Sequence, residues 1–124
     1  MAELAMIAKN ALPNESCAFL LGRSEDNLSQ VEEVMHIANA RSSPYSFSIE
    51  PSDLLQAYTD AESRQLQVVG IFHSHPGRPK PSATDLKYME LNPVVWLIYS
   101  TTEQRFDAYI SDGGARPVEL RITD

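Results

Sequence analysis

The chain has 124 residues, a net charge of −7 and an isoelectric point near 4.8. Its length suits one domain, so we expect a single domain over residues 1–124, and a hydrophobic share of 43% argues against disorder. The acidic balance argues against a protein that binds the phosphates of nucleic acid, and the single cysteine, Cys17, excludes both an internal disulfide and a cysteine-rich zinc site.

The N-terminal segment does not have the features of a targeting signal. Acidic Glu3 precedes basic Lys9, which is the reverse of a signal peptide, and no apolar run is long enough to span a bilayer. We therefore expect no membrane partner and a cytoplasmic location.

The first elements are a helix and two strands. Apolar residues at helical spacing predict a short helix over residues 4–12, which Pro13 ends. Residues 15–21 are apolar on both faces and predict a strand that ends at Gly22. A polar turn then leads to a second predicted strand over residues 31–37.

A second helix is predicted from Pro51, since proline favours the first helical turn. Residues 67–75 predict a central strand, because apolar side chains fill both of its faces. This order of elements predicts an α/β fold, with a mixed sheet on which the helices pack. The remaining predictions are an apolar stripe of Leu54, Leu55, Tyr58 and Ala61 on the second helix, a helix over residues 82–90, strands over residues 94–100, 105–110 and 118–122, and a hairpin turn at Asp112-Gly113-Gly114.

Two histidines two residues apart, His73 and His75, stand at the end of the predicted central strand. Alternate residues of a strand share a face, with Cα atoms about 6.6 Å apart, so both imidazoles can reach one ion through Zn–N bonds of about 2.0–2.1 Å. Asp85 follows in the sequence and offers an oxygen ligand that suits zinc. Two histidines and one carboxylate leave a position for water, which is typical of a catalytic zinc site.

Two further residues are candidates for chemistry at such a site. Glu15 stands at the start of a buried strand, where a charge is unusual unless it faces a polar cleft, and a carboxylate there can take a proton from water. Ser82 can donate a hydrogen bond to an oxyanion, which is typically worth about 2.7–4 kcal/mol. Simpler interpretations exist for each: His73 and His75 as ordinary strand-end residues, Glu15 as a solvated charge, and Ser82 with Asp85 as the capping box of a helix.

The combined pattern resembles the JAMM motif of the MPN+ metalloproteases, and the likeness covers nearly the whole chain in the expected order. The loop over residues 76–81 has six residues where the motif usually has seven. The segments that carry the likeness are His73-Ser74-His75-Pro76, Ser82-Ala83-Thr84-Asp85 and, upstream, Pro13-Asn14-Glu15-Ser16-Cys17-Ala18-Phe19-Leu20-Leu21-Gly22, which is similar to the family's first core strand and its glutamate.

The resemblance implies a cytidine-deaminase-like α/β/α sandwich with a mixed central sheet. It also implies a zinc-dependent isopeptidase that cuts the amide bond after the C-terminal glycine of ubiquitin or a ubiquitin-like (β-grasp) modifier. The expected partners are such a modifier and its conjugates, and a link to the proteasome is a further hypothesis. The implied roles are Zn²⁺ ligands for His73, His75 and Asp85, general base for Glu15, oxyanion stabiliser for Ser82 and structural support for Ser74.

Other functions remain as alternatives. A metal-free binding or scaffold module of the MPN− type would lack the ligands that this chain retains, and processing of a β-grasp sulfur-carrier protein would use the same hydrolysis. A nucleobase deaminase of this fold needs a Cys-x-x-Cys half-site, which one cysteine cannot supply.

Four residues outside the motif have two interpretations each. Tyr45 and Phe47 are either core residues or contacts for an extended substrate tail. Arg78 and Lys80 are either simply solvated or able to attract an acidic surface of a modifier.

Overall fold

The structure is a computed structural model that describes residues 2–12, 14–25, 28–37 and 50–120. None of the helices in these ranges is both long and apolar enough to cross a membrane. The helices are α1 (Ala2–Ala11), α2 (Pro51–Ser63) and α3 (Ala83–Leu91). The strands are β1 (Cys17–Glu25), β2 (Leu28–Ile37), β3 (Gln67–His75), β4 (Val95–Ser100), β5 (Arg105–Ser111) and β6 (Ala115–Val118).

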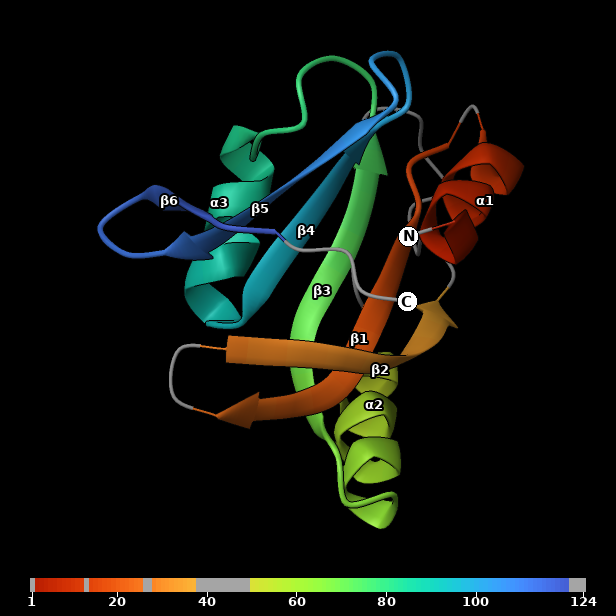
Figure 1. Ribbon diagram of the computed structural model, residues 1–124, viewed down its shortest axis with the longest axis vertical. Coiled ribbons are helices and arrows are strands. Elements are labelled where there is room, and N and C mark those ends of the chain that lie inside the picture. Colours follow the sequence, from red (N-terminus) through yellow and green to blue (C-terminus); the bar gives the residue numbers. More distant parts are fainter. Residues whose placement is uncertain (1, 13, 26–27, 38–49, 121–124) are drawn as a thin grey trace.

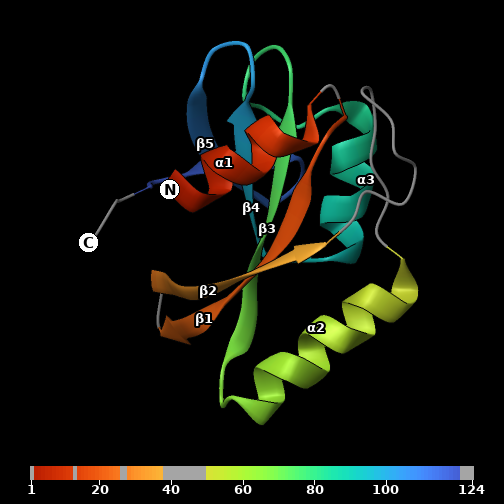
Figure 2. The same cartoon turned by 90° about the vertical axis from the view of Figure 1, so that its right-hand side faces the viewer.

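The strands form one mixed sheet in the order β2-β1-β3-β4-β5-β6 (Figure 1). β3 and β4 are parallel, and the other neighbouring pairs are antiparallel. α1 lies on one side of the sheet, and α2 and α3 lie on the other, as Figure 2 shows. The predicted α/β fold, with helices on both faces of a mixed sheet, is therefore confirmed.

Each face of the sheet has its own core cluster. On one face Leu4 and Ala8 of α1 pack with Phe72 and Leu97. The other cluster contains Phe19, Ile71 and the fully buried Trp96, together with Ala57 and Ala61 of α2 and Met89 of α3. Alternate residues of β1 and β3 enter opposite clusters, which explains why both strands are continuous apolar runs in the sequence.

The sheet topology brings two distant segments to the end of β3. β1 runs antiparallel to β3 with Cys17 opposite His73, so the segment before β1 lies beside the last residues of β3. β3 and β4 are parallel, which requires a crossover between them, and α3 lies in that crossover. The start of α3 and the segment before β1 thus meet at the carboxyl end of β3, a common position for sites in open α/β sheets.

The first strand does not end at Gly22 as predicted, because β1 continues to Glu25. The register between β1 and β2 shifts between Leu21 and Gly22. A Cβ atom at Gly22 would lie 1.8 Å from the carbonyl oxygen of Gln30. The glycine therefore permits a close approach of two strands at a bulge and does not terminate the strand.

The last predicted strand is displaced along the chain. β6 ends at Val118, where the prediction had begun, and residues 121–122 of the prediction lie outside the described residues. Gly113 and Gly114 both have positive φ, as the predicted turn requires, so pairing resumes at once with Ala115 opposite Ser111.

The predicted apolar stripe of α2 is partly wrong. Ala57 and Ala61 are buried, whereas Leu55 is 69% exposed and Tyr58 is 46% exposed. Leu54 and Ala61 of the predicted stripe do pack against the core, together with Ala57. The face of the helix that meets the sheet is therefore turned away from Leu55 and Tyr58.

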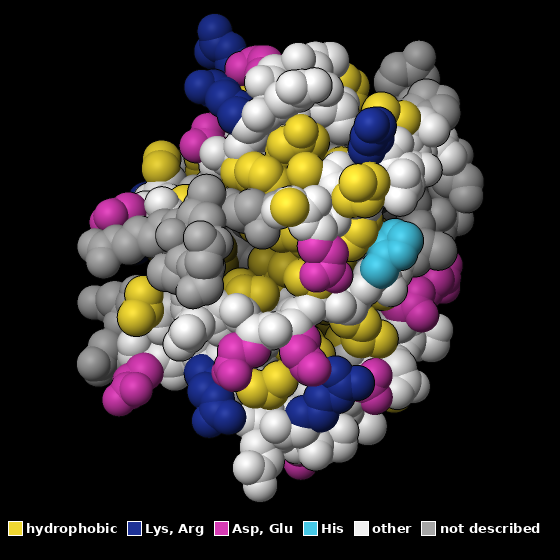
Figure 3. All heavy atoms as spheres, turned by 45° about the vertical axis from the view of Figure 1, so that its right-hand side comes forward, with side chains coloured by type: hydrophobic (Ala, Val, Ile, Leu, Met, Phe, Trp, Pro, Cys, Tyr) yellow, Lys and Arg dark blue, Asp and Glu magenta, His cyan; other side chains and the backbone are white. Residues whose placement is uncertain are grey.

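Acidic and basic side chains lie next to each other at several places on the surface, as the face in Figure 3 shows. These side chains are exposed to water, so such pairs contribute little to stability. In the described part of the chain, arginine forms the ion pairs Arg23–Glu32, Arg64–Glu33, Arg105–Glu103 and Arg116–Asp112.

Candidate metal centre

His73 and His75 lie together on the face of β3 that also carries Ile71 and is covered by α2 and α3. Their ring centroids are 5.1 Å apart, with the ring planes at 61° to each other. The side chain of His73 is 1% exposed and that of His75 is 11% exposed. The two imidazoles therefore share a largely dry space at the strand end, as the spacing predicted.

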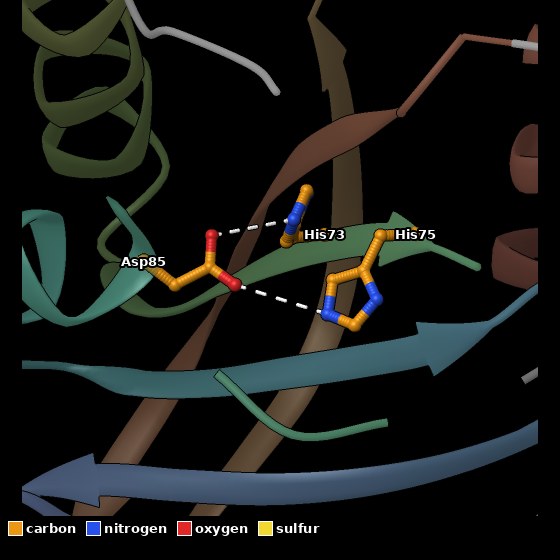
Figure 4. Close-up of side chains that lie close together, drawn as sticks. All are labelled: His73, His75 and Asp85. Carbon is orange, nitrogen blue, oxygen red and sulfur yellow. Dashed lines mark ion pairs between the residues drawn. The ribbon is translucent and has the colours of Figure 1, made fainter. Parts of the chain in front are cut away.

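The first turn of α3 holds Asp85 against these rings. Ser82 is the N-cap of the helix: its Oγ accepts the N–H of Asp85 at 3.1 Å, and its own N–H donates to Asp85 Oδ2 at 2.9 Å. Asp85 Oδ1 lies 3.3 Å from Nε2 of His73, and Oδ2 lies 3.8 Å from Nε2 of His75 (Figure 4). The predicted capping box is confirmed, and it fixes the carboxylate between the two imidazoles.

The carbonyl of Ser16 determines which nitrogen of His73 faces the site. Nδ1 of His73 lies 3.3 Å from this oxygen, and a nitrogen that donates there leaves Nε2 as the acceptor of a neutral ring. Burial lowers the pKa of His73 to about 4, although the charge of Asp85 opposes this shift. Near pH 7 the ring is therefore neutral, which is the form that binds a metal.

Glu15 points its carboxyl group into the same space. It is 7% exposed, and its Oε1 lies 3.2 Å from Nε2 of His73. Burial raises the pKa of Glu15 to about 8, and the negative charge of Asp85 adds to this effect. Of the two interpretations of Glu15, the solvated charge is excluded by its burial.

A pair of buried serines holds Glu15 and His73 in place. The hydroxyls of Ser16 and Ser74 lie 2.5 Å apart, and the N–H of Ser16 donates to Ser74 Oγ at 3.0 Å. The N–H of Ser74 also donates to the carbonyl of Ser16 at 3.0 Å. This bonding ties the residue after Glu15 to the residue after His73, so base and ligand keep a fixed separation.

His75 is fixed by two carbonyl oxygens of the following loop. Its Nδ1 lies 2.9 Å from the carbonyl oxygen of Pro76, and its Nε2 lies 3.0 Å from that of Lys80. Nε2 also faces Asp85. If Nε2 binds an ion, it must therefore exchange its contact with Lys80 for the ion.

The donor set fits a divalent metal. Ligand atoms of His73, His75 and Asp85 all lie within 4.8 Å of one another, so this group could hold a metal ion. Two imidazole nitrogens and one carboxylate oxygen are a ligand set that zinc accepts. Glu15 adds a second carboxyl group to the same buried space, and a cation there would offset the proximity of two carboxylates.

Two residues beside the site belong to the core. Trp96 is fully buried, and its Nε1 donates to the carbonyl of Asn92 at 3.2 Å. Burial and, to a lesser degree, the charge of Asp53 raise the pKa of Cys17 to about 12, so its thiol stays protonated.

Ser16 and Thr102 have no role predicted from the sequence, yet both contact residues next to the metal ligands: Ser16 bonds to Ser74, and Thr102 bonds to Gly77. Thr102, in the turn after β4, accepts the N–H of Gly77 at 2.9 Å. Ser16 stands beside Glu15 in the motif, which could have drawn attention to it, but nothing in the sequence marked Thr102. Tyr45 and Phe47 lie outside the described residues.

The mixed sheet, the helices on both faces and the His-His-Asp cluster at the end of β3 define a domain of the JAB1/MPN type. Residues 1–109 match the family of prokaryotic homologs of the JAB domain, and the chain belongs to this family.

Similar proteins agree with this assignment. A desampylase from Pyrococcus furiosus is 44% identical over 109 residues, which is 87% of this chain and 74% of that protein. The solution structure of a protein from Desulfitobacterium hafniense matches with a TM-score of 0.88 and 31% identity, over 100% of this chain and 88% of that one. A JAB1/MPN domain protein from Archaeoglobus fulgidus has the same fold, with a TM-score of 0.64 and 22% identity over 99% of this chain and 93% of that one.

Proposed function

We propose that this protein is a zinc-dependent isopeptidase that removes a ubiquitin-like modifier from its conjugates. The observation that carries the proposal is the convergence of four side chains, His73, His75, Asp85 and Glu15, at the end of β3. The 44% identity to a desampylase supports the same class of reaction. A non-catalytic scaffold is not favoured, because the chain retains a complete ligand set beside a buried carboxyl group.

Zinc held by His73, His75 and Asp85 would polarise the scissile carbonyl and lower the pKa of water toward about 7. The neutral His73 ring presents Nε2 to the site because its Nδ1 faces the Ser16 carbonyl. Asp85 is kept between the rings by its bonds to Ser82. The chain therefore holds His73 and Asp85 in place before an ion binds, while His75 Nε2 has to leave the Lys80 carbonyl oxygen to complete the set.

Glu15 is the proton carrier in this mechanism. It takes a proton from the attacking water while the water oxygen bonds to the carbonyl carbon, and it delivers that proton to the lysine nitrogen as the C–N bond breaks. In the metal-free protein the pKa of Glu15 is about 8, and a cation bound by the neighbouring ligands would lower this pKa and favour the carboxylate that a base requires. The position of Glu15 beside His73 is therefore part of its function as a base.

Ser82 is the second residue to which we assign a catalytic role. Its Oγ accepts the N–H of Asp85, which leaves the hydroxyl hydrogen to donate elsewhere. Ser82 is exposed at the mouth of the site, where a substrate carbonyl can approach it. A hydrogen bond that forms to the oxyanion as charge develops would speed hydrolysis.

A panel of purified fusions tests the proposal. Each joins a candidate ubiquitin-like or sulfur-carrier protein of the β-grasp type, through its C-terminal glycine, to a lysine side chain or to an α-amine. We expect cleavage after the glycine, loss of cleavage with a chelator and recovery when zinc is added back. Cleavage that persists in the chelator, in protein shown to be metal-free by elemental analysis, would contradict the proposal.

A further inference from the structure

The loop between β3 and α3, residues 76–81, is held rigidly beside the metal centre. Gly77 has a φ of 86°, and its N–H donates to the Thr102 hydroxyl at 2.9 Å. Pro79 is fully buried, and the N–H of Lys80 donates across it to the carbonyl of Arg78 at 2.8 Å. Three prolines in six residues further limit the conformations of the loop.

Two cations stand on either side of the buried Pro79. Arg78 and Lys80 are both exposed, so the loop turns its proline inward and presents these two side chains to solvent. The carbonyl oxygen of Lys80 lies 3.0 Å from Nε2 of His75. The loop backbone that carries these two side chains therefore lies against a candidate metal ligand.

Arg78 differs from the other arginines in the described part of the chain. Those four each form an ion pair with a carboxylate, on a protein with a net charge of −7. Within the same described ranges, neither Arg78 nor Lys80 is paired with a carboxylate. Arg78 is thus the exception among these arginines. With Lys80 it places two cations, unpaired within the described residues, on the loop beside the candidate metal ligands, which an acidic partner would explain.

We propose that Arg78 and Lys80 form a contact for acidic side chains of the substrate that flank the scissile bond. This inference rests on the proposed function and adds a charge preference to it. The loop is already ordered, so little conformational entropy is lost when it binds. The two cations also oppose locally the repulsion that the net charge of −7 exerts on an acidic substrate.

Defined peptides test the proposal. In each substrate, a peptide tail that ends in glycine is joined by an isopeptide bond to the lysine of a target peptide. Two Asp residues are placed either in the tail or around the lysine. In the neutral reference peptides, Asn replaces these Asp residues. We expect one Asp peptide to have a lower KM than the Asn peptide at low salt, with similar kcat. The arm that shows the effect identifies whether the modifier or the target supplies the acid.

The double variant Arg78→Gln/Lys80→Gln is the central measurement. We expect it to raise KM for the preferred Asp peptide by about three- to tenfold at low salt, with kcat and zinc content unchanged, and to remove the difference between Asp and Asn peptides. The wild-type preference should also weaken as salt is added. Lys9→Gln is the control, because it removes an exposed positive charge from α1, which lies on the opposite side of the sheet from α3.

Binding separates this inference from the proposed function. The affinity of the peptides for Glu15→Gln protein can be measured without turnover, with and without the loop substitutions. Absence of cleavage by the wild type contradicts the proposed function alone, since the charge preference would still be seen in binding. The inference is overturned if Asp and Asn peptides have equal affinity and equal KM. It is also overturned if Lys9→Gln raises KM for the Asp peptide as much as the loop variant does.

Discussion

The two carboxylates that approach His73 are held by very different structures. Glu15 Oε1 and Asp85 Oδ1 lie 3.2 and 3.3 Å from the same Nε2 atom. Asp85 stands in the first turn of a helix and accepts the N–H of Ser82. Glu15 lies before β1 in a buried position that raises its pKa to about 8.

This difference shows how similar groups acquire separate tasks. A carboxylate that accepts a backbone N–H in the first turn of a helix cannot readily move, which suits a metal ligand. A carboxyl group in a desolvated position exchanges its proton near neutral pH, which suits a base. The following predictions test this division between Asp85 and Glu15, from the largest expected effect to the smallest.

Asp85→Asn should abolish the metal site without unfolding the helix. Asn retains an oxygen that can accept the Ser82 N–H, but it lacks the charge that a cation requires. We expect metal stoichiometry to fall well below one and hydrolysis to fall by more than about 10³-fold, beyond the loss of a single hydrogen-bond donor. Elemental analysis and circular dichroism provide the measurement, and a variant that binds zinc as well as the wild type would exclude Asp85 as a ligand.

Glu15→Gln should have the opposite pattern. The side chain keeps its size, so the ligands remain in place and zinc content should not change. Loss of the proton carrier should lower kcat by about 10²- to 10⁴-fold. Cleavage of a modifier fusion at near wild-type rate by this variant would remove Glu15 from the mechanism.

Ser82→Gly distinguishes the cap that holds Asp85 from the donor for the oxyanion. Glycine is tolerated at an N-cap at a cost of a few tenths of a kcal/mol, whereas the loss of an oxyanion donor lowers kcat by about 10²- to 10³-fold. We expect a small change in unfolding free energy and a large change in kcat. A variant with normal kcat would leave Ser82 with its capping role alone.

The stability of the metal-free protein should depend on pH through Glu15 and His73 with opposite signs. Glu15 has a raised pKa, so the native state binds a proton that the unfolded chain lacks between about pH 4.5 and 8, and stability falls as pH rises through this window. His73 has a lowered pKa, so stability rises with pH between about 4 and 6.5. The two slopes oppose each other below about pH 6.5, and only the Glu15 slope remains above it.

Urea unfolding of the chelated protein measures this balance. Between pH 6.5 and 8 we expect the free energy of unfolding of the wild type to fall by about 2 kcal/mol relative to that of Glu15→Gln. This corresponds to one proton released over about 1.5 pH units. The variant should instead gain stability between pH 4 and 6.5, because the His73 slope is no longer opposed. Parallel pH profiles for the two proteins would show that Glu15 is not desolvated in solution.

Local patterns in the sequence predicted some elements well and others poorly. The limits of β3 were correct because its apolar residues fill both faces and two histidines end it. The prediction that Gly22 ends the strand is wrong, since glycine marks both a turn and a bulge, and only the close approach of the Gln30 carbonyl oxygen distinguishes them. The stripe of α2 was partly wrong because helical spacing does not show which side of a helix meets the sheet, and Leu55 and Tyr58 lie outside the contact.

By itself the sequence determined what depends on neighbours along the chain. The period of a strand placed His73 and His75 on one face, and the spacing of a capping box placed Asp85 in the first turn of a helix. Tertiary structure decided what depends on residues far apart: the antiparallel register of β1 and β3 that brings Glu15 within 3.2 Å of His73, and the burial that raises its pKa. The likeness to a family had suggested this meeting, but its physical cause is strand pairing and desolvation, and neither is encoded in any short stretch of residues.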